Sequence, residues 1–596
     1  MSDTILVAVA WPYASADIHV GNITGSYLPA DIFARYQRLM GNRVLMVSGS
    51  DAHGTPITVR ADADGKTPRE VYERFHHSFL DLYQRLGLTY DIFTSTHTEN
   101  HFKVAQTIFL ALKKNGFLFT DKSLQWYSPV QGRFLPDRYV EGTCYICGYK
   151  NARSDQCADG CGSLLDATQL IDPRSKIDGS VPELRETEHF FFDLAKLQPV
   201  IVKFLQSRES FWRPNVLRQS LGQILAEDLH ERSYTRDLDW GIPVPLEGWE
   251  GKCIYVWFEA VIGYLSATIE WAKITGQADV WKDWWYNPQA RSYYFIGKDN
   301  IPFHAVIWPA QLHGVGEWFS RLFEGQAGNY LNLPYDVPAN EFMNLEGRKI
   351  SGSANWAVYG LDFLSRYDPD PLRYYLTANM PETRDTDWDW GDFLIRNNNE
   401  LVATWGNLAN RVLSFASRHW DGRVPIPGEL RPQDKEILAT VEYGFGQVGE
   451  LLNTVKLRAA LTEAMRLASE VNKYLDTNAP WFEIKDDKQA AGTTIFTALR
   501  AIDSLKILLS PFIPFSSERL HSYLGYTQPI FGEQITESHK DSKGTHTILR
   551  YLPEKASGRW KPSELSPGQP LGDPEPLFRK LDESLVEEER SRLGRG

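Results

Sequence analysis

The sequence has few cysteines and no long apolar run, and each shortage excludes a class of protein. Five cysteines in 596 residues are too few for a fold that disulfides hold together. No stretch approaches the roughly 20 consecutive apolar residues of a membrane-spanning helix. The first residues also lack the basic start, apolar core and small-residue cleavage site of a secretion signal. We therefore expect a cytoplasmic protein that has no membrane partner.

Positive charge is also in short supply. The formal net charge is −13, from 63 Lys and Arg against 76 Asp and Glu. This argues against a protein that coats nucleic acid without specificity, because phosphate binding by counterion release needs clustered basic residues. It leaves a local basic patch open. A composition of 42% hydrophobic and 23% charged residues is typical of a folded chain, and the length allows about three or four domains.

Apolar runs near the start of the chain predict a parallel sheet. Residues 5–10 and 44–47 are apolar and flank a stretch with helical periodicity, the pattern of a strand–helix–strand unit. Two further strand candidates, residues 253–258 and 293–296, come much later and each runs into polar residues. The sheet is therefore expected to be interrupted by an insertion and then resumed, with ligands bound beyond the carboxyl ends of its strands.

The rest of the chain is mainly helical in pattern, without internal repeats or long low-complexity tracts. Amphipathic periodicity predicts helices over residues 71–88, 101–114, 397–418, 432–452 and 457–475. Between these groups lies a segment rich in glycine and cysteine, residues 143–165, and near the end residues 577–593 predict one charged terminal helix.

Two short motifs suggest a nucleotide site. A histidine at a helix N-terminus, His19, can hydrogen-bond a phosphate, and Gly21 lets a ligand approach where a Cβ would intrude. Lys349, Ser351 and Ser353 supply a cation and hydroxyls from a loop. Taken singly, each motif has a plainer explanation. The first could be a capping turn with an incidental histidine, and the second a solvated basic turn. In this order, with a long insertion between them, they resemble the HIGH and KMSKS signatures of class I aminoacyl-tRNA synthetases.

The sequence between the motifs narrows the resemblance to one family. Over roughly residues 5 to 550 the chain resembles the methionyl-tRNA synthetases in "WPYASADIHVGN", "GSDAHGTPI", "FLPDRYVEGTC", "EHFFFDL", "YVWFEAVIGY", "YFIGKDNIPFHAVIWPA" and "APWFEIK". The resemblance implies an α/β fold: a Rossmann-like parallel-sheet catalytic domain with a zinc-knuckle insertion, followed by an all-α anticodon-binding helical bundle. It also implies a methionine–tRNA ligase, which makes methionyl-adenylate from methionine and ATP and then esterifies tRNA(Met).

The corresponding segments are 1–115 and 246–335 for the two halves of the catalytic domain, 116–245 for the insertion, 336–392 for the KMSKS-like and stem-contact region, 393–552 for the helical domain and 553–596 for a tail with its helix. The resemblance assigns the ATP site to His19, Gly21, Asn22, Gly297, Lys298, Asp299, Lys349, Ser351 and Ser353. Of these, His19, Asn22 and Lys349 would be catalytic, and Mg²⁺ would accompany ATP.

One departure from the family pattern concerns the cation aimed at the leaving pyrophosphate. Gly352 stands where the second lysine of the KMSKS motif is expected, so that Lys349, with Arg348, is the candidate to replace it. Asn22 stands for the second histidine of the HIGH motif and keeps a hydrogen-bond donor there.

The methionine pocket implied by the resemblance must hold an ammonium group and an uncharged thioether. Asp51, at a predicted strand end, can pair with the ammonium. Aromatic walls suit a polarizable sulfur, although aromatic residues at such spacings are more often plain core. The matching positions are Tyr13, Trp257, Ala260, Tyr264, Phe303 and His304.

Four of the five cysteines have metal-ligand spacing. Cys144 and Cys147 are separated by two residues, and Cys157 and Cys161 by three. Four thiolates can close a tetrahedral structural zinc site; the alternative is four reduced, unliganded thiols. We expect one structural Zn²⁺ per chain, and expect Cys253 to be a small buried apolar residue.

The helical region offers a candidate site for an RNA loop. Asn407 and Arg411 are four residues apart and share one helix face, and Trp481 follows a proline beyond another helix. An aromatic plane can stack on an unpaired base while amide and guanidinium groups read its edge. These positions match the family's readers of the CAU anticodon; without that match, a buried tryptophan and a solvated arginine would be the better interpretation. The chain leaves no room for an appended dimerisation domain, so we expect a monomer.

Two alternatives stay open. One is a class I synthetase for leucine, isoleucine or valine, which the compact insertion and the aromatic pocket disfavour. The other is an RNA-binding descendant without catalysis, suggested by Gly352 and disfavoured by the presence of His19, Asp51, Lys298 and Asp299.

Overall fold

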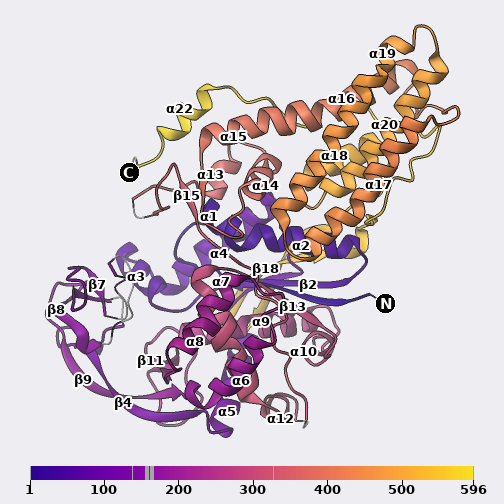
Figure 1. The fold of residues 1–596 in the computed structure, drawn as a ribbon. Coiled ribbons are helices and arrows are strands. Elements are labelled where there is room, and N and C mark those ends of the chain that lie inside the picture. The colour runs from indigo at the N-terminus through magenta and orange to yellow at the C-terminus, as the bar shows by residue number, and fades with distance from the viewer. Residues whose placement is uncertain are drawn as a thin grey trace.

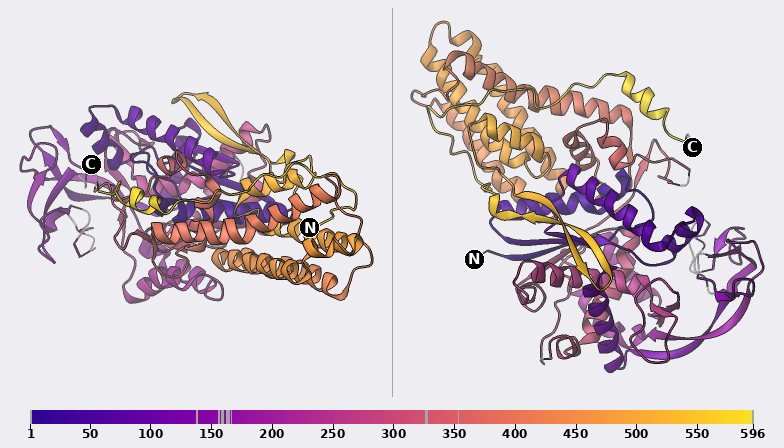
Figure 2. Two further views of the ribbon diagram at one scale, coloured as in Figure 1. Left: turned by 90° about the horizontal axis from the view of Figure 1, so that it is seen from above. Right: turned by 180° about the vertical axis from the view of Figure 1, so that it is seen from behind.

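The chain folds into a central α/β body from which a curved β-ribbon and a helical arm extend on opposite sides (Figures 1 and 2). This computed structural model describes residues 2–136, 139–154, 157, 160–161, 165, 167–325, 328–352 and 354–594. Within them, no helix is both long and apolar enough to cross a membrane.

A seven-stranded sheet forms the centre of the body. Five of its strands are parallel, and the hairpin β17–β18 adds to β3 in the antiparallel sense. In spatial order the strands are β14 (Ala339–Asn340), β13 (Arg291–Gly297), β1 (Thr4–Val9), β2 (Arg43–Ser50), β3 (Ile92–Ser95), β18 (Gly544–Leu552) and β17 (Glu533–Asp541). Three of the strands predicted from apolar runs are confirmed: residues 5–10 lie in and just after β1, residues 44–47 lie in β2, and residues 293–296 lie in β13.

The apolar run of β1 is continuous because the sheet is covered on both faces. Ile5, Val7 and Val9 point into the core that the body shares with the helical arm, whereas Leu6 and Ala8 point into a second core on the other face. Alternate side chains of a strand face opposite sides, so a strand buried on both sides has no polar positions.

Helices of the body cover these two faces. They are α1 (Val20–Asn22), which passes through a π turn (Ile23–Tyr27) into α2 (Leu28–Leu39), α3 (Thr55–Asp64), α4 (Pro68–Leu86), α5 (Glu99–Lys114), α9 (Val256–Ile274), α10 (Lys282–Trp285), α11 (Trp308–Val315), α12 (Trp318–Glu324), α13 (Gly360–Leu364) and α14 (Pro369–Ala378). One strand prediction is wrong. Within residues 253–258, only the end of β12 (Lys252–Ile254) is extended; it pairs with β11 (Thr235–Asp237) outside the main sheet, and α9 begins at Val256. A short apolar run fits a buried helix as well as a strand.

The insertion forms the ribbon, whose long strands β4 (Leu118–Ser128) and β9 (Glu183–Phe192) are antiparallel. At its far end lies a small three-stranded sheet of β6 (Val140–Cys144), β7 (Ala152–Arg153) and β8 (Leu170–Ser175). Shorter elements complete it: β5 (Arg133–Phe134), α6 (Leu194–Gln206), α7 (Pro214–Leu217), α8 (Gln223–Ala226) and β10 (Arg232–Ser233).

The arm is a bundle whose long helices agree with the amphipathic segments of the sequence. Its helices are α15 (Trp390–Arg396), continued by a π-helical stretch (Asn397–Gly406) into α16 (Asn407–His419), then α17 (Pro432–Asn453), α18 (Leu457–Asn478), α19 (Pro480–Glu483), α20 (Lys488–Leu509) and α21 (Pro514–Tyr523). The segment expected to be helical to residue 552 ends instead in the hairpin β17–β18, and the charged terminal helix is shorter than expected, α22 (Ser584–Arg590). Short strands β15 (Met343–Leu345) and β16 (Thr386–Trp388) pair in parallel as a separate two-stranded sheet.

Candidate active site

A cavity of about 460 Å³ opens beyond the carboxyl ends of β1 and β13. This is the position at which parallel sheets bind ligands. Its lining comes from distant parts of the chain, and includes most residues predicted to bind ATP or methionine: Tyr13, His19, Gly21, Asn22, Asp51, Trp257, Ala260, Tyr264, Gly297, Asp299, Phe303, His304 and Lys349.

The His19 motif forms a compact turn at the start of α1. The Asn22 side-chain oxygen accepts a hydrogen bond from the His19 backbone N–H at 3.2 Å. A Cβ on Gly21 would lie 3.0 Å from the His19 ring and 3.2 Å from Ile350, so the glycine lets the motif and the Lys349 loop meet without displacing these side chains. Burial lowers the pKa of His19 to about 4, and its Nδ1 has no hydrogen-bond partner among the described residues. The imidazole is therefore neutral near pH 7.

Lys349 reaches the cavity from a tight hairpin. Leu345 and Arg348 exchange backbone hydrogen bonds across Glu346 and Gly347, both of which have positive φ, 49° and 74°. Lys349 follows directly and lines the cavity. Arg348 instead places its guanidinium over the Trp356 ring, 4.1 Å from the centroid. The structure thus separates two cations that the sequence had grouped.

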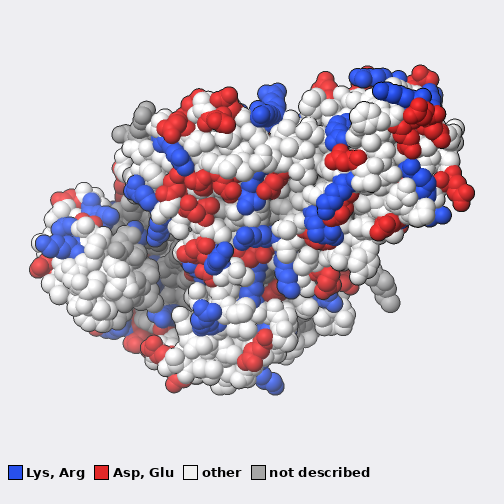
Figure 3. Space-filling model, turned by 45° about the horizontal axis from the view of Figure 1, so that its top comes forward, with Lys and Arg blue, Asp and Glu red and all other residues white. Residues whose placement is uncertain are grey.

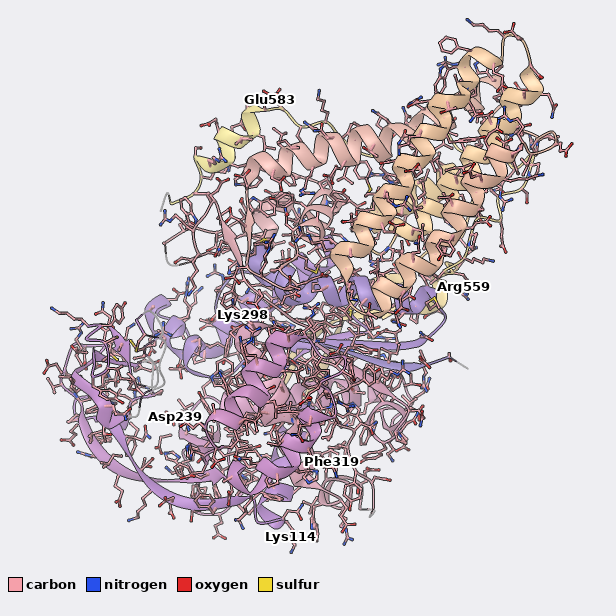
Figure 4. All side chains as sticks on the ribbon, in the orientation of Figure 1. Lys114, Asp239, Lys298, Phe319, Arg559 and Glu583 are labelled. Atoms are coloured by element: carbon pink, nitrogen blue, oxygen red, sulfur yellow. The ribbon has the colours of Figure 1, made fainter. Side chains whose placement is uncertain are left out.

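The other members of the predicted ATP site differ in position. A Cβ on Gly297 would lie 2.8 Å from Asp299 Oδ1, so this glycine makes room for the carboxylate. Lys298 Nζ donates to Glu341 and Asp385 at 2.7 and 2.8 Å. Lys298, near the middle of the molecule in Figure 4, is not part of the cavity lining among the described residues. Ser351 pairs through its backbone with Trp356, and Ser353 lies outside the described residues.

Aromatic rings form one wall of the cavity. Trp257 stacks on Phe303, with ring centroids 4.4 Å apart and planes at 17°, and Tyr13 meets the same indole edge-on at 5.7 Å. Trp257 and Ala260 come from the start of α9, whereas Phe303 is the first residue of a π turn (Phe303–Ile307) that follows β13. These contacts form an apolar surface suited to a thioether.

His304 closes this wall with a polar but uncharged group. Its Nδ1 lies 2.9 Å from the Asn300 carbonyl, and its Nε2 lies 2.7 Å from the Tyr264 hydroxyl. Because a carbonyl only accepts, Nδ1 carries the proton and Nε2 accepts from Tyr264. Burial lowers the pKa of His304 to about 4, so no charge forms here near pH 7.

Asp51 is the buried carboxylate of the cavity, with 2% of its surface exposed. Its backbone is held on both sides: the Asp51 N–H donates to the Pro12 carbonyl at 2.8 Å, and the Asp51 carbonyl accepts from Ala14 at 3.0 Å. Burial raises the pKa of Asp51 well above its usual value, and the nearby Glu259 adds to the rise. A ligand ammonium would favour the ionised form.

Trp11 also belongs to the site, although it was not predicted from the sequence. Its indole lies between Gly49 of β2 and Gly263 of α9, where added Cβ atoms would come within 2.2 and 2.5 Å of the ring, and it lines the cavity. A glycine inside a strand and one inside a helix signal such a close approach, but nothing local shows that both serve the same side chain.

Comparison with known proteins shows which family the chain belongs to. A family model described as tRNA synthetases class I (M) matches residues 5–413, and one described as the anticodon binding domain of methionyl tRNA ligase matches residues 424–549. The methionine–tRNA ligase of Thermomicrobium roseum is 56% identical over 595 residues, which cover 100% of this chain and 99% of the relative. That of a Roseiflexus species is 54% identical over 604 aligned positions, with 100% and 99% covered. The chain belongs to the class I methionine–tRNA ligases.

A solved structure of a methionyl-tRNA synthetase from Mycobacterium tuberculosis, in complex with methionyl-adenylate, has the same fold. Its TM-score is 0.73 at 23% identity, over 97% of this chain and 100% of that one. The predicted family and fold class are confirmed, and a ligase for leucine, isoleucine or valine is excluded.

The cysteines of this methionine–tRNA ligase family member converge at the end of the ribbon. The Sγ atoms of Cys144, Cys147, Cys157 and Cys161 all lie within 4.8 Å of one another. Two Sγ–Sγ distances are 3.9 Å, Cys144 to Cys161, and 3.6 Å, Cys147 to Cys157. Such a cluster can hold a metal ion. Cys253 is buried apart from them, as expected.

The residues expected to read an anticodon lie on the arm. The Arg411 guanidinium sits over the Trp481 ring, 4.5 Å from the centroid, and donates to Asp476 at 3.1 Å. Asn407 and Arg411 are both exposed on α16, and Trp481 lies on α19. On the face in Figure 3, basic and acidic side chains are mixed over the arm and gather at its tip.

Proposed function

We propose that this protein activates methionine with ATP, releasing pyrophosphate, and then transfers methionine from methionyl-adenylate to the 3′ end of tRNA(Met). The observation that supports this best is that one cavity brings the His19 turn and Lys349 together with a buried carboxylate, Asp51, beside the aromatic wall. One part suits a polyphosphate and the other suits a small amino acid with an apolar side chain.

In the first step, a carboxylate oxygen of methionine attacks the α-phosphorus of ATP and the bond to the β,γ-pyrophosphate breaks. Such a step depends on positioning and charge neutralisation. We assign hydrogen-bond donation to His19 and Asn22, neutralisation of pyrophosphate charge to Lys349, and binding of the ribose hydroxyls to Asp299. Gly21 and Gly297 keep the approach free of side chains. The proposed ATP site also includes Lys298, Ser351 and Ser353. To contact ATP, Lys298 would have to leave its ion pairs with Glu341 and Asp385.

Recognition of methionine divides between charge and shape. Asp51 would pair with the ammonium group, and the rings of Tyr13, Trp257 and Phe303 would enclose the thioether. The His304–Tyr264 pair is neutral and provides no counter-charge, so it disfavours binding of an amino acid whose side chain is charged. Ala260 leaves space along the wall.

Two metal ions are proposed. A tetrahedral zinc with sulfur ligands at about 2.3 Å needs sulfur–sulfur distances of about 3.8 Å, and the measured 3.9 and 3.6 Å fit. Cys144, Cys147, Cys157 and Cys161 would hold Zn²⁺ as a structural ion that stabilises the end of the ribbon. Mg²⁺ would enter with the phosphates of ATP.

For the tRNA, we propose that Asn407, Arg411 and Trp481 bind the CAU anticodon, with Trp481 as the stacking surface. The protein would act as a cytoplasmic monomer, with the six segments given above as its domains. Methionine-dependent exchange of pyrophosphate into ATP tests the first step, and charging of a tRNA with a CAU anticodon tests the second. Leucine, isoleucine and valine serve as control substrates. A protein that binds this tRNA but catalyses no exchange would instead be an RNA-binding descendant.

A further inference from the structure

Behind Asp51, four side chains form a continuous hydrogen-bonded chain that the proposed reaction does not use. Glu259 Oε1 lies 2.5 Å from His53 Nδ1, His53 Nε2 lies 2.9 Å from His97 Nδ1, and His97 Nε2 lies 3.1 Å from Arg69 NH2. Glu259 and His53 are 0% and 1% exposed. The chain runs from the helix of the methionine wall to the surface helix α4.

The guanidinium fixes the direction of every bond in this chain. Arg69 can only donate, so His97 Nε2 accepts, and a neutral His97 must carry its proton on Nδ1. His97 then donates to His53 Nε2, which leaves the His53 proton on Nδ1, where it donates to Glu259. Burial lowers the pKa of both His53 and His97 to about 3, so that both rings are neutral. One tautomer of His53 is therefore selected from outside the cavity.

This bond ties the two halves of the amino-acid site together. His53 follows Asp51 by two residues, and its backbone N–H lies 3.4 Å from Asp51 Oδ1. Glu259 belongs to α9, between the wall residues Trp257 and Ala260. The loop is also held by Trp240, whose indole N–H donates to the Ala52 carbonyl at 2.6 Å.

We propose that His53 is a positioning residue for the substrate ammonium group: through Glu259 and His97 it fixes the loop that carries Asp51 against the helix that carries the pocket wall. The inference rests on the proposed function, because it concerns how that site binds methionine. Without the ring of His53, the aromatic wall stays but the Asp51 carboxylate loses its fixed place relative to it.

The test compares methionine with its deaminated analogue, in which hydrogen replaces the amino group. Calorimetry gives the dissociation constant of each for the full chain and for His53→Leu. We expect methionine to bind about tenfold or more weaker to the variant, the scale of a lost hydrogen bond to a charged group, and the analogue to change by less than about twofold. In pyrophosphate exchange, the KM for methionine should rise while the KM for ATP and kcat stay nearly constant.

Three further variants separate positioning from general damage. His53→Asn keeps an N–H donor near the Nδ1 position and should restore most of the preference for methionine over the analogue. His101→Leu is the matched control, since His101 is an equally buried histidine that bonds α9 at Ser266; it should leave that preference unchanged. His97→Phe removes the bond that selects the tautomer and should weaken the preference in part.

An equal loss for both ligands in His53→Leu, or an unchanged ratio, overturns the proposal. If that variant does not fold, the ratio in His97→Phe decides, and a ratio equal to that of the unaltered chain overturns it. Failure of the unaltered chain to bind methionine or to catalyse exchange would refute the proposed function instead.

Discussion

Replacing Lys349 with alanine tests whether one cation replaces the lysine pair of the usual motif. Lys349 lines the cavity, and its charge acts to lower the pKa of Asp299, which lines the same cavity. If one full negative charge formed on the pyrophosphate about 5 Å from the Lys349 ammonium, their attraction would lower the activation free energy by about 3 kcal/mol at an effective dielectric constant of about 20. The charge on pyrophosphate develops only in part, so we expect a loss of about 1.4 to 2.7 kcal/mol, or about 10- to 100-fold in the adenylation rate.

Arg348 supplies the matched control. Its guanidinium is held over Trp356 at 4.1 Å, and it is not part of the described cavity lining. Arg348→Ala should therefore change the adenylation rate by less than about threefold, because a charge that is exposed and held outside the cavity contributes little to stabilising the leaving pyrophosphate. Adjacent cations that acted interchangeably would give similar losses.

A gain-of-charge variant completes the test. Gly352 has no left-handed backbone conformation, and among the described residues an added Cβ would meet only the Tyr359 hydroxyl, at 3.4 Å. A lysine therefore fits, and Gly352→Lys should recover part of the activity lost in Lys349→Ala. The assay is stopped-flow adenylate formation at saturating methionine, which should bind with unchanged affinity. A normal rate in Lys349→Ala, or an equal loss in Arg348→Ala, would refute the reasoning.

Three other perturbations have definite expected outcomes. The double variant Cys144→Ser, Cys147→Ser should lose the one zinc per chain found by metal analysis, and should lower the melting temperature and tRNA transfer more than methionine affinity; a native chain without zinc would contradict this. Trp481→Ala should cost about 1 to 3 kcal/mol in tRNA recognition but leave pyrophosphate exchange normal, whereas Trp481→Phe retains a ring; equal loss of both reactions with a lower melting temperature would indicate a structural role. Stability should fall as the pH falls from 6.5 to about 4, because His76 and His304 have pKa values lowered to about 4 by burial and the unfolded chain binds protons that the folded chain does not; chemical denaturation at several pH values measures this, and a flat profile would contradict it.

The sequence was most informative where a motif and a strand end coincide. The HIGH-like turn, Asp51 and Asp299 each follow a strand, and the common edge of a parallel sheet brings them to one cavity. Periodicity likewise predicted the long helices of the arm, because their buried faces repeat along one element.

Interactions between distant segments could not be read in this way. Residues 253–258 are apolar enough for a strand. However, the first two of them pair with β11, outside the main sheet, and α9 begins at Val256. The hairpin β17–β18 follows the helical arm in sequence but joins β3, more than 400 residues earlier. Trp11 depends on two glycines in different elements, and the place of Lys298 depends on carboxylates of Glu341 and Asp385.

A fully buried arginine lies where the arm meets the body. Arg373 on α14 is 0% exposed and donates to Asp31 on α2, to the Leu86 carbonyl at the end of α4, and to the carbonyls of Pro511 and Phe512 that follow α20. Burial alone would raise the pKa of Asp31, but the surrounding arginine charges lower it to about 2. Beside the apolar core that the body and the arm share, the junction thus contains an ion pair whose hydrogen-bond partners come from both sides.

Rotation of the arm about this junction would separate buried hydrogen bonds to a charged group, each worth about 1.5 to 3 kcal/mol. We therefore expect the arm and the body to move together, so that Trp481 lies at a fixed distance from the cavity. A rigid connection allows anticodon contacts to contribute to tRNA binding equally before and during transfer, and such uniform binding changes KM without changing kcat. The loss in Trp481→Ala should accordingly appear in the KM for tRNA. A fall in kcat at saturating tRNA would mean instead that anticodon binding alters the cavity, and would require a hinge at Arg373 that its hydrogen bonds oppose.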